Sequence, residues 1–205
     1  MSNTIALKGE GKRARAKAAN RKAILEAARG VFARIGYEAT TVRDIIRETE
    51  LAAGTFYNYF KSKEEVFEAI SDDSVRRFRP LLEQVRGRST SFEDYIRGAY
   101  RAYFQFLKNE NDEAINRGAP HLALIGVRVD TPEMQTVFEE IRTDLEGVWL
   151  GGDTHNIDTE YLTAAAVGIA RELGDHMLQR RPVDVDDATS FATSMLLAGI
   201  AGMPK

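Results

Sequence analysis

The stretch TTVRDIIRETELAAGTFYNYFKSK, residues 40–63, constrains the fold more than any other part of the chain. It reads as two short helices joined by a tight turn at residues 50–52. Thr41 can cap the first helix while Asp44, three residues later, reaches back to it in a capping box. The second helix, about residues 53–59, carries polar and aromatic side chains that an ordinary core helix lacks. One apolar bracing helix followed by one polar-aromatic helix is the arrangement of a DNA-binding helix-turn-helix.

Helical periodicity surrounds this motif. From Arg21 apolar residues recur at intervals of three and four, and Gly36 ends that helix because glycine adopts the left-handed conformation at low cost. Ser62 caps a further helix that has acidic residues in its first turn and that we expect to end near Pro80. Residues 1–19 lack apolar periodicity and are predicted to form a mobile basic arm.

The remainder of the chain also reads as helices. Residues 92–108 are apolar nearly all round, which is typical of a central, buried helix. A short helix at residues 110–118 and a longer one that begins at Pro132 follow it. Two long helices, about residues 158–180 and 184–202, close the chain. No strand alternation is convincing, so the predicted fold is all-α.

Charge is distributed unevenly along the sequence. Residues 1–63 carry 13 Lys and Arg against 6 Asp and Glu, a net +7, whereas the remaining residues carry 15 against 25, a net −10. A basic N-terminal unit joined to a larger acidic body suggests that only the first unit touches a polyanion. We therefore expect a DNA-binding domain over residues 1–66, with the basic arm, and a helical domain over residues 67–205.

Composition argues against several other classes of protein. Cys is absent, which excludes disulfides, thiolate catalysis and Cys-ligated metals. No run approaches the roughly 18 apolar residues of a membrane span, and the basic N-terminal residues have no apolar stretch behind them, so we expect no secretory signal and a cytoplasmic location. His121, His155 and His176 share no metal-binding interval. No phosphate-cradling loop or nucleophile elbow is found, so an enzyme is the weaker hypothesis and no cofactor is expected.

The sequence resembles the tetracycline-repressor (TetR) family of bacterial transcription regulators. The segments ILEAARGVFARIGYEATTVRDI and GTFYNYFKSKEEVF, within about residues 21–70, carry the resemblance. The rest of the chain matches only in length and helical character. Glu50 stands where members have Gly in the turn, and a left-handed conformation there would be mildly unfavourable. Ala52 stands where members have a capping Ser, so it forgoes roughly 1 kcal/mol.

The resemblance implies DNA contacts within the motif. The expected set is Thr41, Arg43, Gly54, Thr55, Tyr57, Asn58, Tyr59 and Lys63. Gly54 and Thr55, at the front of the recognition helix, would approach base edges, and the other residues would contact phosphates, with Asn58 able to do either. A side chain at position 54 could hold the backbone away from the DNA. Phe56 and Phe60 are expected to be core anchors instead.

The resemblance also assigns ligand binding and dimerisation to the second domain. A homodimer would place two recognition helices in successive major grooves, roughly 34 Å apart. The last two helices are the expected interface, through Ala165, Gly168, Leu173, Met177, Phe191, Met195 and Leu196. The alternative is that these two helices complete a monomeric core. The middle helices would enclose an apolar effector, with Tyr100, Tyr103, Phe104, Leu107, His121, Phe138 and Trp149 as lining, although each of these is also a natural core residue.

The leading hypothesis is a repressor that an apolar small molecule releases from a double-stranded DNA operator. A regulator controlled by a protein partner, or one that activates transcription, would show the same sequence features. An open cavity with a convergent polar group would favour control by a small molecule, and a closed core would favour a protein partner.

Overall fold

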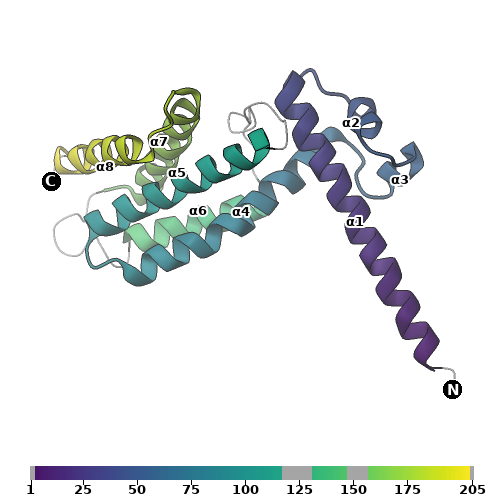
Figure 1. The fold of residues 1–205 in the computed structure, drawn as a ribbon. Coiled ribbons are helices and arrows are strands. Elements are labelled where there is room, and N and C mark those ends of the chain that lie inside the picture. The colour runs from purple at the N-terminus through teal and green to yellow at the C-terminus, as the bar shows by residue number, and fades with distance from the viewer. Residues whose placement is uncertain (1–2, 117–130, 147–156, 204–205) are drawn as a thin grey trace. The chain divides into compact units, whose positions relative to one another are not determined.

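The computed structural model describes residues 3–116, 131–146 and 157–203, and of residues 3–10 and 12 the backbone alone. These parts of the chain form eight helices and contain no strand (Figure 1), so the all-α prediction is confirmed. None of the described helices is long and apolar enough to cross a bilayer. The chain divides into two compact units. The first unit spans residues 1–71, and the second unit spans most of residues 72–205.

The first unit contains α1 (Asn3–Ile35), α2 (Val42–Glu48), α3 (Ala53–Tyr57) and the beginning of α4 (Lys63–Arg88). α1 begins at Asn3, inside the segment for which a mobile arm was predicted. The Ala, Lys and Arg residues that fill this segment are good helix formers even without an apolar face. Gly36 ends α1 with a φ of 82°, as its sequence position predicted.

The core of the first unit is built from one face of each of its helices. Its fully or nearly fully buried apolar side chains include Ile24, Ala28, Val31, Phe32, Ile45, Phe56, Phe60, Val66, Phe67 and Ile70. Tyr37 follows the end of α1 and places its ring centroid 5.4 Å from that of Phe32 and 4.9 Å from that of Phe67. Aromatic contacts of this kind join the first and fourth helices and fix the frame from which α2 and α3 project.

The second unit contains the rest of α4 together with α5 (Phe92–Asn116), α6 (Pro132–Asp144), α7 (Thr159–Gln179) and α8 (Val185–Ala201). α5 packs against α7 and α8, and α7 also contacts α6 (Figure 1). α5 and α7 pack tightly at Gly174, where an added Cβ would lie 2.5 Å from Cδ1 of Leu107. A side chain at this position would therefore force the two helices apart or displace the leucine.

Two helix boundaries differ from the sequence prediction. α4 continues through Pro80 to Arg88, because Pro80 lies on the exposed face while Leu82 and its neighbours remain packed in the core of the second unit. α5 is one helix where two were predicted, and it keeps a single buried face through Leu107 and Asn111. Packing along that face outweighs the polar sequence that suggested a break after residue 108.

Candidate DNA interface and ligand cavity

The start of α2 is fixed by the capping box that the sequence predicted. The backbone N–H of Thr41 donates to Oδ2 of Asp44 at 3.0 Å, and the N–H of Asp44 donates to Oγ1 of Thr41 at 3.3 Å. Hydrogen bonds from the Thr41 side chain and backbone lower the pKa of Asp44. Two of the free backbone N–H groups at this helix end are thereby satisfied.

The turn between α2 and α3 closes through a side chain. The hydroxyl of Thr49 donates to the carbonyl oxygen of Ile46 at 2.8 Å and accepts from the N–H of Leu51 at 3.2 Å. No residue other than glycine has a positive φ in the described parts of the chain. Glu50 is therefore not in the left-handed conformation that would be unfavourable for it, because the Thr49 hydroxyl closes the turn without one. Ala52 caps α3 without a side-chain hydrogen bond, as expected.

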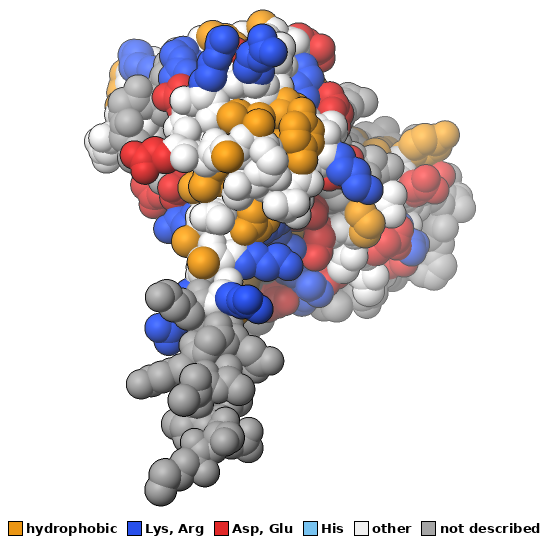
Figure 2. Space-filling view, turned by 90° about the vertical axis from the view of Figure 1, so that its right-hand side faces the viewer, with side chains coloured by type: hydrophobic (Ala, Val, Ile, Leu, Met, Phe, Trp, Pro, Cys, Tyr) orange, Lys and Arg blue, Asp and Glu red, His pale blue; other side chains and the backbone are white. Residues whose placement is uncertain are grey.

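α3 directs most of its side chains to solvent. Tyr57 is 57% exposed, Gly54 and Asn58 are also exposed, and Thr55 and Tyr59 are partly so. Figure 2 looks onto one face of the molecule, where Lys and Arg side chains border an area of apolar and uncharged groups. An exposed helix with hydroxyl and amide groups beside cations suits a partner that carries phosphates and polar base edges.

Two aromatic residues, Phe56 and Phe60, anchor α3 to the core of the first unit. Phe56 is 1% exposed and Phe60 is 5% exposed, which confirms both as core anchors. Their ring centroids lie 6.2 Å apart, and the guanidinium of Arg21 lies 5.5 Å from the centroid of the Phe60 ring. The short helix is thus stabilised through its buried side, which leaves the other side available.

Gly54 is not required by the packing of the first unit. An added Cβ at this position would meet no atom within 4 Å, and its φ is not in the left-handed region. Glycine in a helix destabilises it by up to about 1 kcal/mol relative to alanine. The fold of the first unit would therefore accept alanine at this position.

Lys63, by contrast, is engaged inside the first unit. Its ammonium group donates to the carbonyl oxygens of Tyr37 at 2.9 Å and Glu38 at 3.1 Å, and it lies 4.6 Å from the centroid of the Tyr37 ring. One of its three protons is left for another acceptor. Thr41 and Arg43 have exposed side chains on and before α2.

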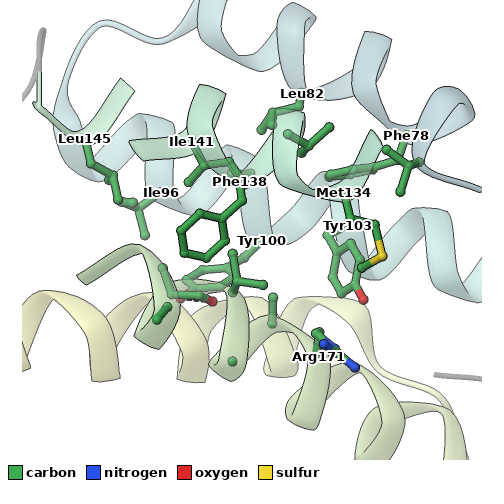
Figure 3. A pocket seen from close by; sticks show the side chains of 18 of the residues that line it. Phe78, Leu82, Ile96, Tyr100, Tyr103, Met134, Phe138, Ile141, Leu145 and Arg171 are labelled. Atoms are coloured by element: carbon green, nitrogen blue, oxygen red, sulfur yellow. Dashed lines mark hydrogen bonds between the residues drawn. The ribbon is translucent and has the colours of Figure 1, made fainter. Parts of the chain in front are cut away.

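The second unit contains an open cavity of about 840 Å³ between α4, α5, α6 and α7 (Figure 3). Its lining is mainly apolar and includes Val75, Phe78, Leu82, Tyr95, Ile96, Ala99, Tyr100, Tyr103, Met134, Val137, Phe138, Ile141, Leu145, Ala166 and Arg171. Small-molecule sites have this size and this predominance of apolar side chains.

The predicted lining is recovered in part. Tyr100, Tyr103 and Phe138 border the cavity. Phe104 and Leu107 do not: they are buried in the core, close to Gly174. His121 and Trp149 lie outside the described residues.

Sequence reasoning missed the contributions of α4 and α7 to the cavity. Val75 and Phe78 line it from α4, and Arg171 lines it from α7. The apolar residues carry no signal that separates them from ordinary core. Arg171 does carry a signal in the sequence, because this charged residue directly follows a run of small and apolar residues, AAAVGIA.

A polar cluster lies behind the cavity wall, which it reaches through Tyr95. The hydroxyl of Tyr95 donates to Oδ2 of Asp144 at 2.7 Å, and Nε of Arg86 lies 2.6 Å from Oδ1 of the same carboxylate. Burial, followed by the hydrogen bond to Asp144, raises the pKa of Tyr95. The cluster joins α4, α5 and α6 through the buried carboxylate of Asp144, which would be costly to leave without partners.

Residues 24–70 match the family model for bacterial regulatory proteins of the tetR family. This segment of the chain therefore belongs to the TetR family. The transcriptional repressor KstR2 of Mycolicibacterium smegmatis is 30% identical to it over 98 residues, 48% of each chain. The chain spans about half the length of the first curated relatives it matches, 46% and 48%.

Two solved structures extend the likeness to most of the chain. The fatty acid degradation regulator FadR from Bacillus halodurans has a TM-score of 0.68 at 21% identity, with 88% of this chain and 95% of that chain covered. RolR, in complex with resorcinol, has a TM-score of 0.60 at 19% identity, with 93% and 97% covered. At these identities the likeness shows a shared fold.

The residues expected at the dimer interface fall into two groups. Phe191 and Met195 on α8 are 59% and 54% exposed, Ala165 is exposed, and Gly168 and Leu173 are partly so. Met177 and Leu196 are instead buried in the core of the same chain, at 3% and 5% exposure. The exposed group alone is available to a second copy.

Proposed function

We propose that this regulator is a cytoplasmic homodimeric repressor that leaves a double-stranded DNA operator when an apolar small molecule enters the cavity. The observation that carries the proposal is α3, an exposed helix with polar side chains and a bare backbone at Gly54. KstR2 is a transcriptional repressor and RolR is seen with resorcinol, which supports both halves of the proposal. The large cavity favours a small molecule over a protein partner, since the latter would leave a closed core.

In this proposal α3 enters the major groove with its N-terminal end first. Gly54 lets the backbone approach the DNA, and Thr55 contacts base edges from the same turn. The hydroxyls of Tyr57 and Tyr59 donate to phosphates, and Asn58 contacts a phosphate or a base edge. Phosphate contacts set the position of the helix, whereas contacts with base edges select the sequence.

Basic groups outside α3 complete the proposed interface. Thr41 and Arg43 contact the sugar-phosphate backbone beside the groove, and the remaining proton of Lys63 contacts it at the N-terminus of α4, where the helix dipole favours an anion. Arg13 and Arg15 have exposed side chains on α1. They add attraction that does not depend on sequence and that weakens as salt is raised.

Dimerisation is proposed through the exposed faces of α7 and α8. Phe191 and Met195 are four residues apart, so they lie on one side of α8. Large apolar side chains exposed together on a helix mark an association surface. Ala165 and Gly168 on α7 would allow a partner helix to approach closely. Two recognition helices, roughly 34 Å apart, could then read two half-sites.

Gly54→Ala tests the proposal most directly. Alanine should stabilise the first unit by up to about 1 kcal/mol, because α3 gains helix propensity and the Cβ meets nothing. The same Cβ should weaken DNA binding by about tenfold or more, equivalent to about 1.4 kcal/mol, because it holds the backbone off the DNA. Fluorescence anisotropy with a duplex selected by the unaltered protein from a random pool gives the affinity, and urea denaturation gives the stability.

Gly30→Ala is the matched control. Gly30 lies within α1, and an added Cβ there also meets no atom within 4 Å, so its stability gain should be similar and its DNA affinity unchanged. If Gly54→Ala binds DNA as tightly as the unaltered protein, α3 does not approach DNA as proposed. A stoichiometry of one chain per duplex would contradict the homodimer.

A further inference from the structure

The cavity contains hydroxyl groups that the fold already uses. The hydroxyl of Tyr95 donates to Asp144 at 2.7 Å, and the hydroxyl of Tyr100 donates to the carbonyl oxygen of Ala166 at 3.2 Å. Burial raises the pKa of both tyrosines, so both phenols stay protonated and keep donating. A ligand therefore meets an essentially apolar surface along this part of the cavity.

Two other polar groups, Tyr103 and Arg171, line the cavity at one end (Figure 3). Tyr103 on α5 and Arg171 on α7 lie toward the same end, while Ile96 and Leu145 lie toward the other (Figure 3). Burial raises the pKa of Tyr103 to about 12, and the positive charge of Arg171 opposes that rise. The charge on the guanidinium is thus felt at the phenol, and near neutral pH both groups are hydrogen-bond donors.

Acidic side chains are confined to the outer edge of the cavity. Glu139 and Glu172 border it but are exposed to solvent, and Glu139 is paired with Arg142 at 2.7 Å. Exposed carboxylates are screened by water and salt, whereas a partly buried cation acts at close range. The interior is therefore electropositive at one end and apolar along the remainder.

We infer that the effector is an amphipathic carboxylic acid whose carboxylate binds Arg171 and Tyr103 and whose apolar body extends toward Ile96 and Leu145. This inference rests on the proposed function. A carboxylate accepts hydrogen bonds from both groups, and a guanidinium has five N–H donors, so it can add a ligand to its existing contacts. From Tyr103 to Ile96 along α5 is seven residues, or about 10 Å, which suits an extended chain or a fused-ring body.

The test compares three ligands that share one tail and differ in charge. Dodecanoate, dodecanol and dodecylammonium are titrated into the full-length protein by isothermal calorimetry, below their micellar concentrations. The acid should bind at least about tenfold more tightly than the alcohol, because only the acid forms charge-assisted hydrogen bonds. The ammonium ion should bind most weakly.

Substitutions assign this preference to the residues. Arg171→Gln should weaken binding of the acid by about ten- to a hundredfold and leave the alcohol unchanged. Tyr103→Phe should have a smaller effect in the same direction. Arg97→Gln is the matched control, because Arg97 is an exposed arginine on α5 that pairs with Glu93 and does not line the cavity. Thermal midpoints show that each variant is folded, and Tyr103→Phe replaces Arg171→Gln if the latter is not.

The outcomes separate this inference from the proposed function. Equal affinity for the acid and the alcohol, or tightest binding of the ammonium ion, would overturn the carboxylate assignment. Selective DNA binding without binding of any probe would also overturn it, while leaving the DNA-binding regulator intact. Binding of the acid that depends on Arg171, in a protein that ignores every duplex, would support the site and contradict the repressor.

Discussion

In the first unit Ala28 and Phe32 are fully buried, and the groups proposed to bind DNA lie on the exposed side of α3. In the second unit the helices surround an open cavity of about 840 Å³, and the groups proposed to bind a ligand line its inner wall. In these proposals the first unit uses its core for stability and its surface for binding. The second unit uses its interior for both stability and binding.

This difference separates the demands on individual residues. Phe56 in the first unit only has to pack, because it is 1% exposed and turned away from the proposed DNA surface. Phe138 in the second unit packs against its neighbours and borders the cavity at the same time. We expect substitutions in the core of the first unit to lower stability without directly changing DNA binding. Substitutions in the cavity wall of the second unit should change stability and ligand binding together.

Truncating one phenylalanine in each unit should give the largest contrast. Phe56→Ala should lower the free energy of unfolding by about 3–5 kcal/mol, because a fully buried ring leaves an empty space. Phe138→Ala should lower the free energy of unfolding by only about 1–2 kcal/mol, because that ring already borders an empty space. Urea denaturation followed by far-ultraviolet circular dichroism measures both, and equal losses would show that the cavity is filled in the native protein.

Adding the same volume to each unit should give a smaller contrast of the same kind. Ala28→Leu should destabilise the first unit by about 1–3 kcal/mol, because Ala28 is 0% exposed and has no room to grow. Ala99→Leu should change stability by less than about 1 kcal/mol, because its new methyl groups enter the cavity. It should also weaken the response of DNA binding to a ligand, as anisotropy would show. A loss at position 99 as large as that at position 28 would mean that the wall near Ala99 is closed.

Much of the first unit was predictable because short-range rules determine it. The capping box of Thr41 and Asp44, the glycine end of α1 and the burial of Phe56 each follow from a few neighbouring residues. The turn at Glu50 was less predictable, because the glycine of the family pattern leaves a left-handed residue possible there. Thr49 instead closes the turn with its own hydroxyl.

The second unit was less predictable because it depends on contacts between distant segments. Periodicity showed that Tyr100, Tyr103 and Phe104 lie in a helix, but only packing decides which two border the cavity. The extension of α4 past Pro80 likewise depends on tertiary burial of residues beyond it, such as Leu82. Arg171 belongs to the cavity because α7 crosses it, and nothing in the local sequence fixes that crossing.

The smallest predicted contrast concerns two helix caps. Thr41→Ala removes the cap of α2, and Thr131→Ala removes the hydroxyl that accepts from the N–H of Met134 at 3.2 Å at the start of α6. Each substitution should cost roughly 1 kcal/mol near neutral pH. In the first unit, however, the cap is coupled to a carboxylate, because Thr41 is the main cause of the lowered pKa of Asp44.

The pH dependence of the two losses should therefore differ. A group with a lowered folded-state pKa stabilises the protein above its ordinary value, here 3.8, and this stabilisation is lost as the pH falls through the folded-state value. The penalty of Thr41→Ala should thus shrink as the pH is lowered below about 4, since protonated Asp44 no longer gains from the Thr41 hydrogen bonds. The penalty of Thr131→Ala should stay constant, because its hydroxyl does not titrate. Urea denaturation of both variants across this pH range measures the difference. Parallel curves would show that Thr41 does not lower the pKa of Asp44.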